Sequence, residues 1–389
     1  MNLVPFSTQH LRLRESLPFG LRDGGGRMLL SAGVAVANED VLARLQASDL
    51  FADETESAAW LRRLGSAMDT MMRQGASLKQ IANVRPVAEK ARADGASQSL
   101  VAQWTEMEST LDSVLREVRA DTPWQARLAQ LRERAGRLAD RRPDAALYWM
   151  VYGAGHNTER YCSRHSLFCW LLLRDAGRAL AWDVDLLASV ELASLTMNVA
   201  MRRLQDQLAS SDLRVTADTR ALIDAHPAQG AELLQAAGVT DPVWLQAVRQ
   251  HHDSGPDQAT ALLRRVDIYT AKLSCRLKRA PMSSLQAARE ARLGPDGQPD
   301  AVGAALLKGL GLYPPGSLLG LASGEIGIVV ARGARFDQPL MAVLINASGA
   351  PVGHPALRDT SQPRHAIKGP VDVRSVRMIP PHEVLMAVR

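Results

Sequence analysis

Apolar residues that recur every three or four positions constrain the fold of this chain more than any other feature of its sequence. The runs are Trp104, Met107, Leu111, Val114 and Val118; then Leu128, Leu131, Ala135 and Leu138; then Leu186, Val190, Ala193, Met197, Ala200 and Leu204. This spacing places apolar side chains on one face of an α-helix. It predicts helices that pack on each other, either as a layer within the chain or as a dimerising or signal-transmitting element.

The two ends of the chain have a different pattern. Short apolar runs flank the Gly24-Gly25-Gly26 turn, which predicts two strands, followed by a helix from Glu39. After residue 316, runs such as EIGIVV and PLMAVLI predict a small antiparallel β unit, with a loop over 351–374. We therefore predict a mainly α chain with a helical bundle domain, a small N-terminal α/β module, a helical connecting layer and a small C-terminal β-rich unit. The predicted boundaries are 1–53, 54–143, 144–311 and 312–389.

Composition excludes several classes of protein. The 389 residues carry a formal net charge of +5 without any block of five like charges, so we predict no nucleic-acid partner. The longest strongly apolar stretch is 167–173, shorter than the roughly twenty residues of a membrane span. The first residues lack a basic start followed by an apolar run, so we expect that they are not a secretory signal. The cysteines form no CxxC pair, which favours a reduced cytoplasmic setting with all of them as buried apolar side chains.

The histidines are clustered. Of the nine, five fall within about a hundred residues, and Asp267 follows them; these are His156, His165, His226, His251 and His252. Imidazole and carboxylate groups are ligands for divalent metals. Two simpler interpretations stay open. His226 precedes Pro227 and could start or cap a helix, and adjacent His251 and His252 point about 100° apart unless the helix ends there.

Residues 146–312 resemble the HD-GYP domain, a branch of the HD metal-dependent phosphohydrolases. The similarity lies in motifs at matching spacing: His165-Ser166-Leu167-Phe168-Cys169 against HSxRVA, His226-Pro227-Ala228-Gln229-Gly230 against HPxxGxxIL, the His251-His252 pair, and Val266-Asp267 through Arg279 against VADxxDALTSxRxYR. The resemblance implies an HD-type all-helical bundle and cyclic di-GMP as the ligand. It also implies an iron or manganese centre, with His165, His226, His251, His252 and Asp267 as metal ligands and Arg276 and Arg279 at the substrate phosphates.

The chain departs from this family where the metals are bridged. Met197-Asn198 stands in place of the namesake His-Asp pair, and the GYP motif is missing after His252. A thioether is a poor ligand for hard Fe²⁺ or Mn²⁺. The Asn198 amide keeps one oxygen but lacks the negative charge that holds two cations together, so we treat it as a weak candidate ligand.

These departures leave three hypotheses. We favour a cyclic di-GMP signalling protein whose degenerate domain is catalytically impaired, binds one divalent metal (Fe or Mn) or none, and acts by ligand or protein binding. The alternative is an active phosphodiesterase in which Asn198 helps to hold the metals and Arg276 and Arg279 clamp the phosphates. The third is a pure protein–protein interaction module, with the apolar run 104–118 as a self-association surface of a homodimer. The sequence leaves open whether the chain is an enzyme and which signalling proteins it contacts.

Overall fold

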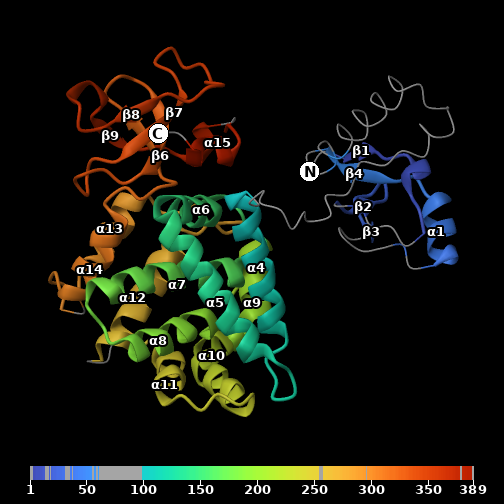
Figure 1. The fold of residues 1–389 in the computed structure, drawn as a ribbon, viewed down its shortest axis with the longest axis horizontal. Helices are drawn as coiled ribbons and strands as arrows, with labels where there is room; N and C mark the ends of the chain where they lie inside the picture. The colour runs from blue at the N-terminus through green and yellow to red at the C-terminus, as the bar shows by residue number, and fades with distance from the viewer. Residues whose placement is uncertain are drawn as a thin grey trace. The chain divides into compact units, whose positions relative to one another are not determined.

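The protein consists of two compact units, residues 1–97 and 98–389, in the computed structural model (Figure 1). The residues that the structure describes are 3–13, 17, 19–30, 36, 38–54, 57, 60, 99–253, 257–294, 296–376 and 379–387. Most of the first half of the predicted connecting region, 61–98, lies outside these described residues.

Among its described residues, the N-terminal unit contains a four-stranded antiparallel sheet in the order β1-β4-β2-β3, together with the helix α1. Its elements are β1 (Leu3–Pro5), β2 (Leu21–Arg22), β3 (Met28–Leu30), α1 (Glu39–Gln46) and β4 (Phe51–Asp53). The predicted glycine turn joins β2 to β3, with Gly26 at a φ of +83° that favours glycine. The Asn38 side chain accepts a hydrogen bond from the Val41 amide and so caps α1 at the predicted start. The small α/β module is confirmed.

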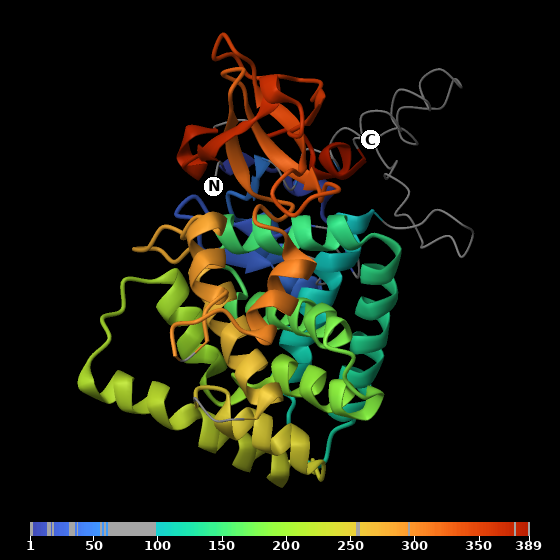
Figure 2. The same cartoon turned by 90° about the vertical axis from the view of Figure 1, so that its left-hand side faces the viewer.

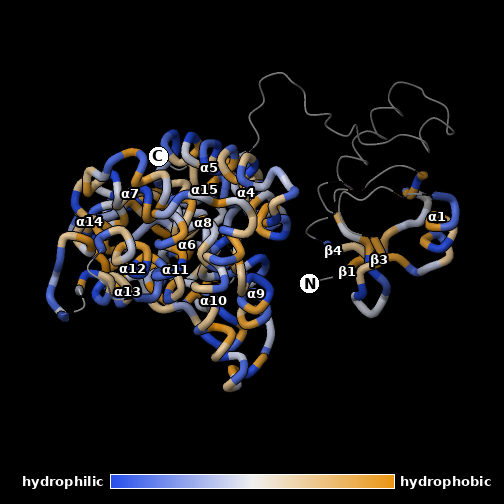
Figure 3. Tube along the Cα trace, turned by 90° about the horizontal axis from the view of Figure 1, so that it is seen from below, coloured by the Kyte–Doolittle hydropathy of each residue, from blue (hydrophilic) through white to orange (hydrophobic). Residues whose placement is uncertain are grey.

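The second unit is a helical bundle with a small β sheet, which confirms the predicted mainly α fold (Figure 1). Hydrophobic and hydrophilic residues alternate along its helices, as expected of amphipathic helices around a core (Figure 3). The helices are α4 (Leu100–Arg116), α5 (Trp124–Arg141), α6 (Pro143–His156), α7 (Tyr161–Ala179), α8 (Val184–Thr196), η2 (Val199–Met201), α9 (Arg202–Ser210), α10 (Ala217–Ala236), α11 (Pro242–Gln250), α12 (Gln258–Leu273), α13 (Ser284–Ala291) and α14 (Ala301–Leu310).

Helix α7 lies at the centre of the bundle. It packs against α4, α6, α8, α9, α12 and α14, and nearly all of its side chains are buried. The apolar stretch 167–173 is therefore surrounded by other helices, which is the usual place for a helix that is hydrophobic on all sides.

The heptad-like runs of α4 and α5 belong to the same core. Trp104, Leu111 and Val114 in α4, and Leu128 and Ala135 in α5, are fully buried and pack in one cluster with α7. The interpretation of the run 104–118 as a self-association surface is wrong, because the chain's own helices already cover these side chains.

The run 186–204 does not form one helix. Helix α8 ends at Thr196, a 3-10 turn (η2) follows, and α9 starts at Arg202. The Trp244 indole nitrogen donates to the Thr196 hydroxyl over 2.8 Å and ties this break to α11. By length and composition alone, Val184–Ser210 is apolar enough to cross a membrane, but half of its apolar window is buried in the bundle. We interpret it as core helices.

The C-terminal β unit is confirmed as a five-stranded antiparallel sheet in the order β8-β7-β6-β5-β9. Its elements are β5 (Leu318–Leu321), β6 (Ile326–Ala331), β7 (Leu340–Ile345), β8 (Leu357–Asp359), β9 (Ile367–Pro370) and α15 (His382–Ala387). The unit lies at one end of the bundle over α6, as Figure 2 shows, where Tyr148 packs against Leu318 and Ile328. The prediction of a loop over 351–374 is wrong, because β8 and β9 lie within it.

A buried ion pair joins α4, α6 and α7. The Arg164 guanidinium lies 3.0 Å from the Glu108 carboxylate, and both side chains are less than a tenth exposed. The same carboxylate accepts a hydrogen bond from the Trp149 indole, and Arg164 also donates to the Asn157 carbonyl. Removal of one partner would leave a buried charge without compensation.

We therefore expect Glu108→Ala to lower the free energy of unfolding by about 3–5 kcal/mol. Glu106→Ala, two residues away on α4, is the matched control because Glu106 pairs with Arg134 at the surface; its expected cost is at most about 1 kcal/mol. Urea denaturation of both variants measures the difference. Equal losses would contradict the structural role of the buried pair.

Candidate metal centre

The five predicted ligands come from separate helices and meet in the bundle. His165 is on α7, His226 on α10, and Asp267 on α12, while His251 and His252 follow the end of α11. They form two groups whose ligand atoms lie within 4.8 Å of one another. We call His226, His251 and His252 the imidazole group, and His165, Cys169 and Asp267 the mixed group. Asp267 links them, because its second oxygen lies 3.9 Å from His252 Nδ1.

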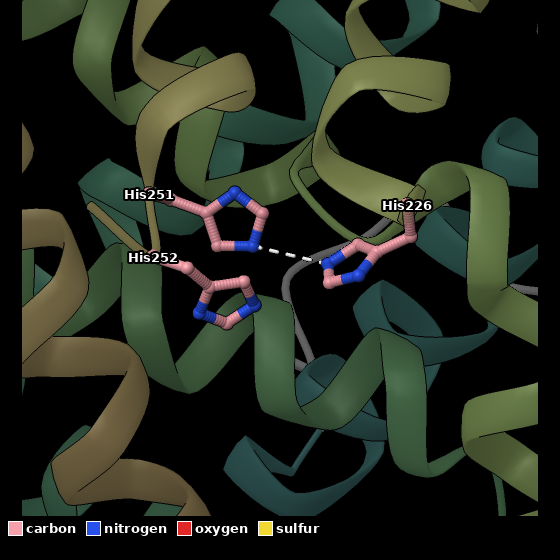
Figure 4. A group of neighbouring side chains, drawn as sticks. All are labelled: His226, His251 and His252. Carbon is pink, nitrogen blue, oxygen red and sulfur yellow. Dashed lines mark hydrogen bonds between the residues drawn. The ribbon is translucent and has the colours of Figure 1, made fainter. Parts of the chain in front are cut away.

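The imidazole group is formed by rings that converge on one point (Figure 4). The Nε2 atoms of His226 and His251 are 3.1 Å apart, and the ring centroids of His251 and His252 are 4.1 Å apart. His226 and His251 are fully buried, whereas the His252 side chain is 45% exposed. The adjacent histidines share this space because α11 ends at Gln250. A helix end at this point is what the sequence analysis expected for two neighbouring side chains that face one site.

Pro227 explains how His226 is oriented. It lies inside α10 and has no amide hydrogen, so the Ile223 carbonyl four residues earlier lacks its helical donor. The His226 Nδ1 atom takes that place, at 2.5 Å from the Ile223 oxygen. The interpretation of His226 as a helix start is therefore wrong, since the His-Pro pair lies in the interior of a helix.

His251 is oriented in the same way by a helix end. Its Nδ1 lies 2.7 Å from the Val248 carbonyl, one of the last carbonyls of α11, which lack a helical donor. Both rings therefore carry the proton on Nδ1, and the Nε2 lone pairs of His226 and His251 face each other. Burial lowers the pKa of His226, and it lowers that of His251 to about 3, so both rings are neutral at pH 7.

Two lone pairs at this distance repel each other unless a cation lies against them. Neutral imidazoles that expose Nε2 while Nδ1 donates to a carbonyl are the form in which histidine binds metals. The imidazole group therefore fits a divalent cation.

The mixed group centres on a buried hydrogen bond. His165 Nε2 lies 2.8 Å from Asp267 Oδ1. Burial opposes the charge of each group, but for Asp267 the contact with His165 prevails and lowers the pKa to about 2. For His165, the Cys169 sulfur and the Asp267 carboxylate outweigh burial and raise the pKa well above its ordinary value. The two side chains form an ion pair.

Cys169, a member of this group, and Thr270, which contacts it, were not among the predicted ligands. The Cys169 sulfur lies 3.6 Å from His165 Nε2 and 3.1 Å from the Thr270 hydroxyl. Cys169 follows His165 by four residues and Thr270 follows Asp267 by three, so each shares a helix face with a predicted ligand. That spacing is the signal that could have identified them.

Asn198 lies at the break between α8 and η2. Its side chain is buried, and its amide nitrogen has no hydrogen-bond partner among the described residues. The same turn lies against α10 at Gly230, one helical turn from His226. A Cβ atom added to Gly230 would lie 3.6 Å from the Met197 carbonyl oxygen. Met197 itself is fully buried in the core.

The predicted phosphate contacts lie beyond the helix on which they were expected. Helix α12 ends at Leu273. The backbones of Arg276 and Arg279 hydrogen-bond to each other across a tight turn. The Arg276 guanidinium lies 5.5 Å from the centre of the Tyr161 ring, and that ring stacks on His165. Arg279 donates to the Ala271 and Ser274 carbonyls at the end of α12.

No protein-family model matches the chain. Over 191 residues the chain is 23% identical to a curated cyclic di-GMP phosphodiesterase of Pseudomonas aeruginosa, a match that covers 46% of this chain and 46% of that protein. The chain therefore matches less than half the length of this relative. A solved HDG"Y"P protein of Bdellovibrio bacteriovorus is similar with a TM-score of 0.43 and 14% identity, over 78% of this chain and 98% of that chain. The Pseudomonas protein confirms the predicted resemblance to cyclic di-GMP phosphodiesterases.

Acid should destabilise the metal-free protein through His251. The pKa of His251 is lowered to about 3 in the fold, whereas an unfolded histidine titrates at about 6.5. Because the pKa of His251 is lower in the folded state than in the unfolded state, the neutral ring contributes stability that is complete above the unfolded pKa. This contribution is lost as the pH falls toward the folded pKa. We expect the free energy of unfolding in chelator to fall by about 1.4 kcal/mol per pH unit below pH ~6.

His251→Asn should flatten this pH dependence, whereas His354→Asn, at an exposed position outside both groups, should keep it. Denaturant unfolding between neutral and mildly acidic pH measures the slopes. Equal slopes in the wild type and in His251→Asn would show that His251 is not the group responsible.

Proposed function

We propose that the chain is a cyclic di-GMP-binding protein of the HD-GYP type whose site is degenerate for hydrolysis, and that it acts by ligand and protein binding. One observation carries the proposal. Asp267 is the single carboxylate in the two ligand groups found among the described residues, and it is already paired with His165.

The imidazole group would hold one hard divalent cation, Fe²⁺ or Mn²⁺, through His226, His251 and His252. When bound, that cation supplies a Lewis acid that attracts a phosphate oxygen. The backbone contacts of His226 and His251 keep both Nε2 atoms directed at one point, and the burial of these two rings keeps water away from them.

Hydrolysis by two metals needs cations about 3.5–4 Å apart that share an anionic bridge. The resemblance assigns the bridging position to Asn198, which is uncharged. Asp267 is the single carboxylate in the ligand groups of the described residues, so it brings one negative charge against two cations and does not make up for the missing anionic bridge. This is why binding, rather than turnover, is the function that we favour.

Arg276 is our candidate for the phosphate contact. Its position over Tyr161, which stacks on His165, places it next to the mixed group, and its Nε atom is buried without a partner among the described residues. Arg279 has a different role, because its hydrogen bonds to the end of α12 hold the turn that carries Arg276.

We expect cyclic di-GMP to bind the manganese-loaded protein, and Arg276→Ala to weaken this binding by about 10-fold or more, the cost of a charged hydrogen bond. Lys278→Ala should leave affinity unchanged, because Lys278 is exposed in the same turn and pairs with Asp212. Calorimetric titration measures both. Absence of any binding by the wild type would favour the pure protein–protein interaction module.

We also expect no hydrolysis of cyclic di-GMP above the rate of His251→Asn, measured by chromatography of the nucleotide products with iron or manganese present. A faster wild-type rate that Asn198→Ala abolishes would support the alternative of an active phosphodiesterase. That outcome would contradict our interpretation of Met197-Asn198.

A further inference from the structure

The mixed group contains a sulfur atom, and this distinguishes it chemically from the imidazole group. We propose that His165, Asp267 and Cys169 form a separate site for a borderline-soft divalent cation, Zn²⁺, with the Cys169 thiolate as a ligand. The proposal rests on the proposed function only in placing metals at this centre. It does not require cyclic di-GMP to bind.

The distances suit tetrahedral zinc. Zinc binds sulfur at about 2.3 Å and imidazole nitrogen at about 2.0 Å, so two such ligands on one ion lie about 3.5 Å apart. The Cys169 sulfur lies 3.6 Å from His165 Nε2. In the metal-free protein a proton lies between His165 Nε2 and Asp267 Oδ1. The cation would take the place of this proton, because both atoms point toward it.

The charges also balance. Binding of Zn²⁺ sends the proton between His165 and Asp267 and the thiol proton of Cys169 to solvent, which leaves one thiolate and one carboxylate against two positive charges. A neutral cluster is far cheaper to bury than a net charge. Cys169 is fully buried and His165 is 2% exposed, so this balance matters here. The imidazole group offers no negative charge.

Thr270 holds both ligands in place. Its hydroxyl oxygen lies 3.3 Å from His165 Nδ1, which directs His165 Nε2 toward the cation. The same hydroxyl donates to the Val266 carbonyl over 2.9 Å and lies 3.1 Å from the Cys169 sulfur. When the thiol is deprotonated, the Thr270 hydrogen can turn from the carbonyl to the sulfur. A partner of this kind is typical of metal ligands.

Sulfur changes which metal is preferred. Thiolates select zinc over hard cations such as Mn²⁺, which prefer oxygen. Cys162 shows that burial on α7 alone does not create a site. It lies two turns earlier and is equally buried, but it belongs to neither ligand group.

The test uses the full-length protein loaded with Co²⁺ as a spectroscopic substitute for zinc. We expect a near-ultraviolet sulfur-to-cobalt charge-transfer band that Zn²⁺ removes by competition. Cys169→Ser and Cys169→Ala should lose the band and at least about 10-fold in zinc affinity. Cys162→Ser, the matched control, should keep both, and circular dichroism checks that each variant is folded.

His251→Asn separates this proposal from the proposed function. It should remove manganese binding at the imidazole group and keep the sulfur band. Loss of the band in His251→Asn as well would show one shared site and overturn the proposal. A band that survives both Cys169 substitutions, or a wild type that binds Co²⁺ without a band or binds no Co²⁺, would also overturn it.

Discussion

The centre depends on the buried hydrogen bond between His165 and Asp267. It joins α7, the enclosed helix of the bundle, to α12, and it occupies one oxygen of the single carboxylate in the ligand groups of the described residues. The other oxygen faces His252. Asp267 thus contacts both groups, and Asn198 adds no charge. The imidazole group therefore has only neutral nitrogen ligands, whereas the mixed group has a carboxylate and a sulfur.

Backbone carbonyls without helical donors decide how the histidines point. Pro227 frees the Ile223 carbonyl inside α10, and the end of α11 frees the Val248 carbonyl. Each carbonyl faces Nδ1 of one histidine, and each Nε2 is thereby directed at the other ring. Pro227 therefore orients the ring of His226 whichever metal binds, because it leaves free the carbonyl that His226 contacts.

The helices and strands could be predicted where the pattern is local. The three-and-four spacing identified α4 and α5, and the glycine turn identified β2 and β3, because these patterns depend on neighbours in sequence. The break after Thr196 was missed, since the apolar spacing continues through Met197 into α9. Strands β8 and β9 were missed because both are short, and β9 also pairs with β5, a strand distant in sequence.

The sequence by itself determined which side chains are available: the histidines, Asp267, the absent His-Asp pair, and the period that makes helices. Residue type and spacing are enough for that. Only the tertiary structure decided that Thr270 and Asp267 join His165 and Cys169, that the run 104–118 is covered by α7, and that Asp267 is shared. The physical reason is that each of these facts depends on contacts between helices far apart in the chain, and periodicity specifies a helix face but not what packs against it.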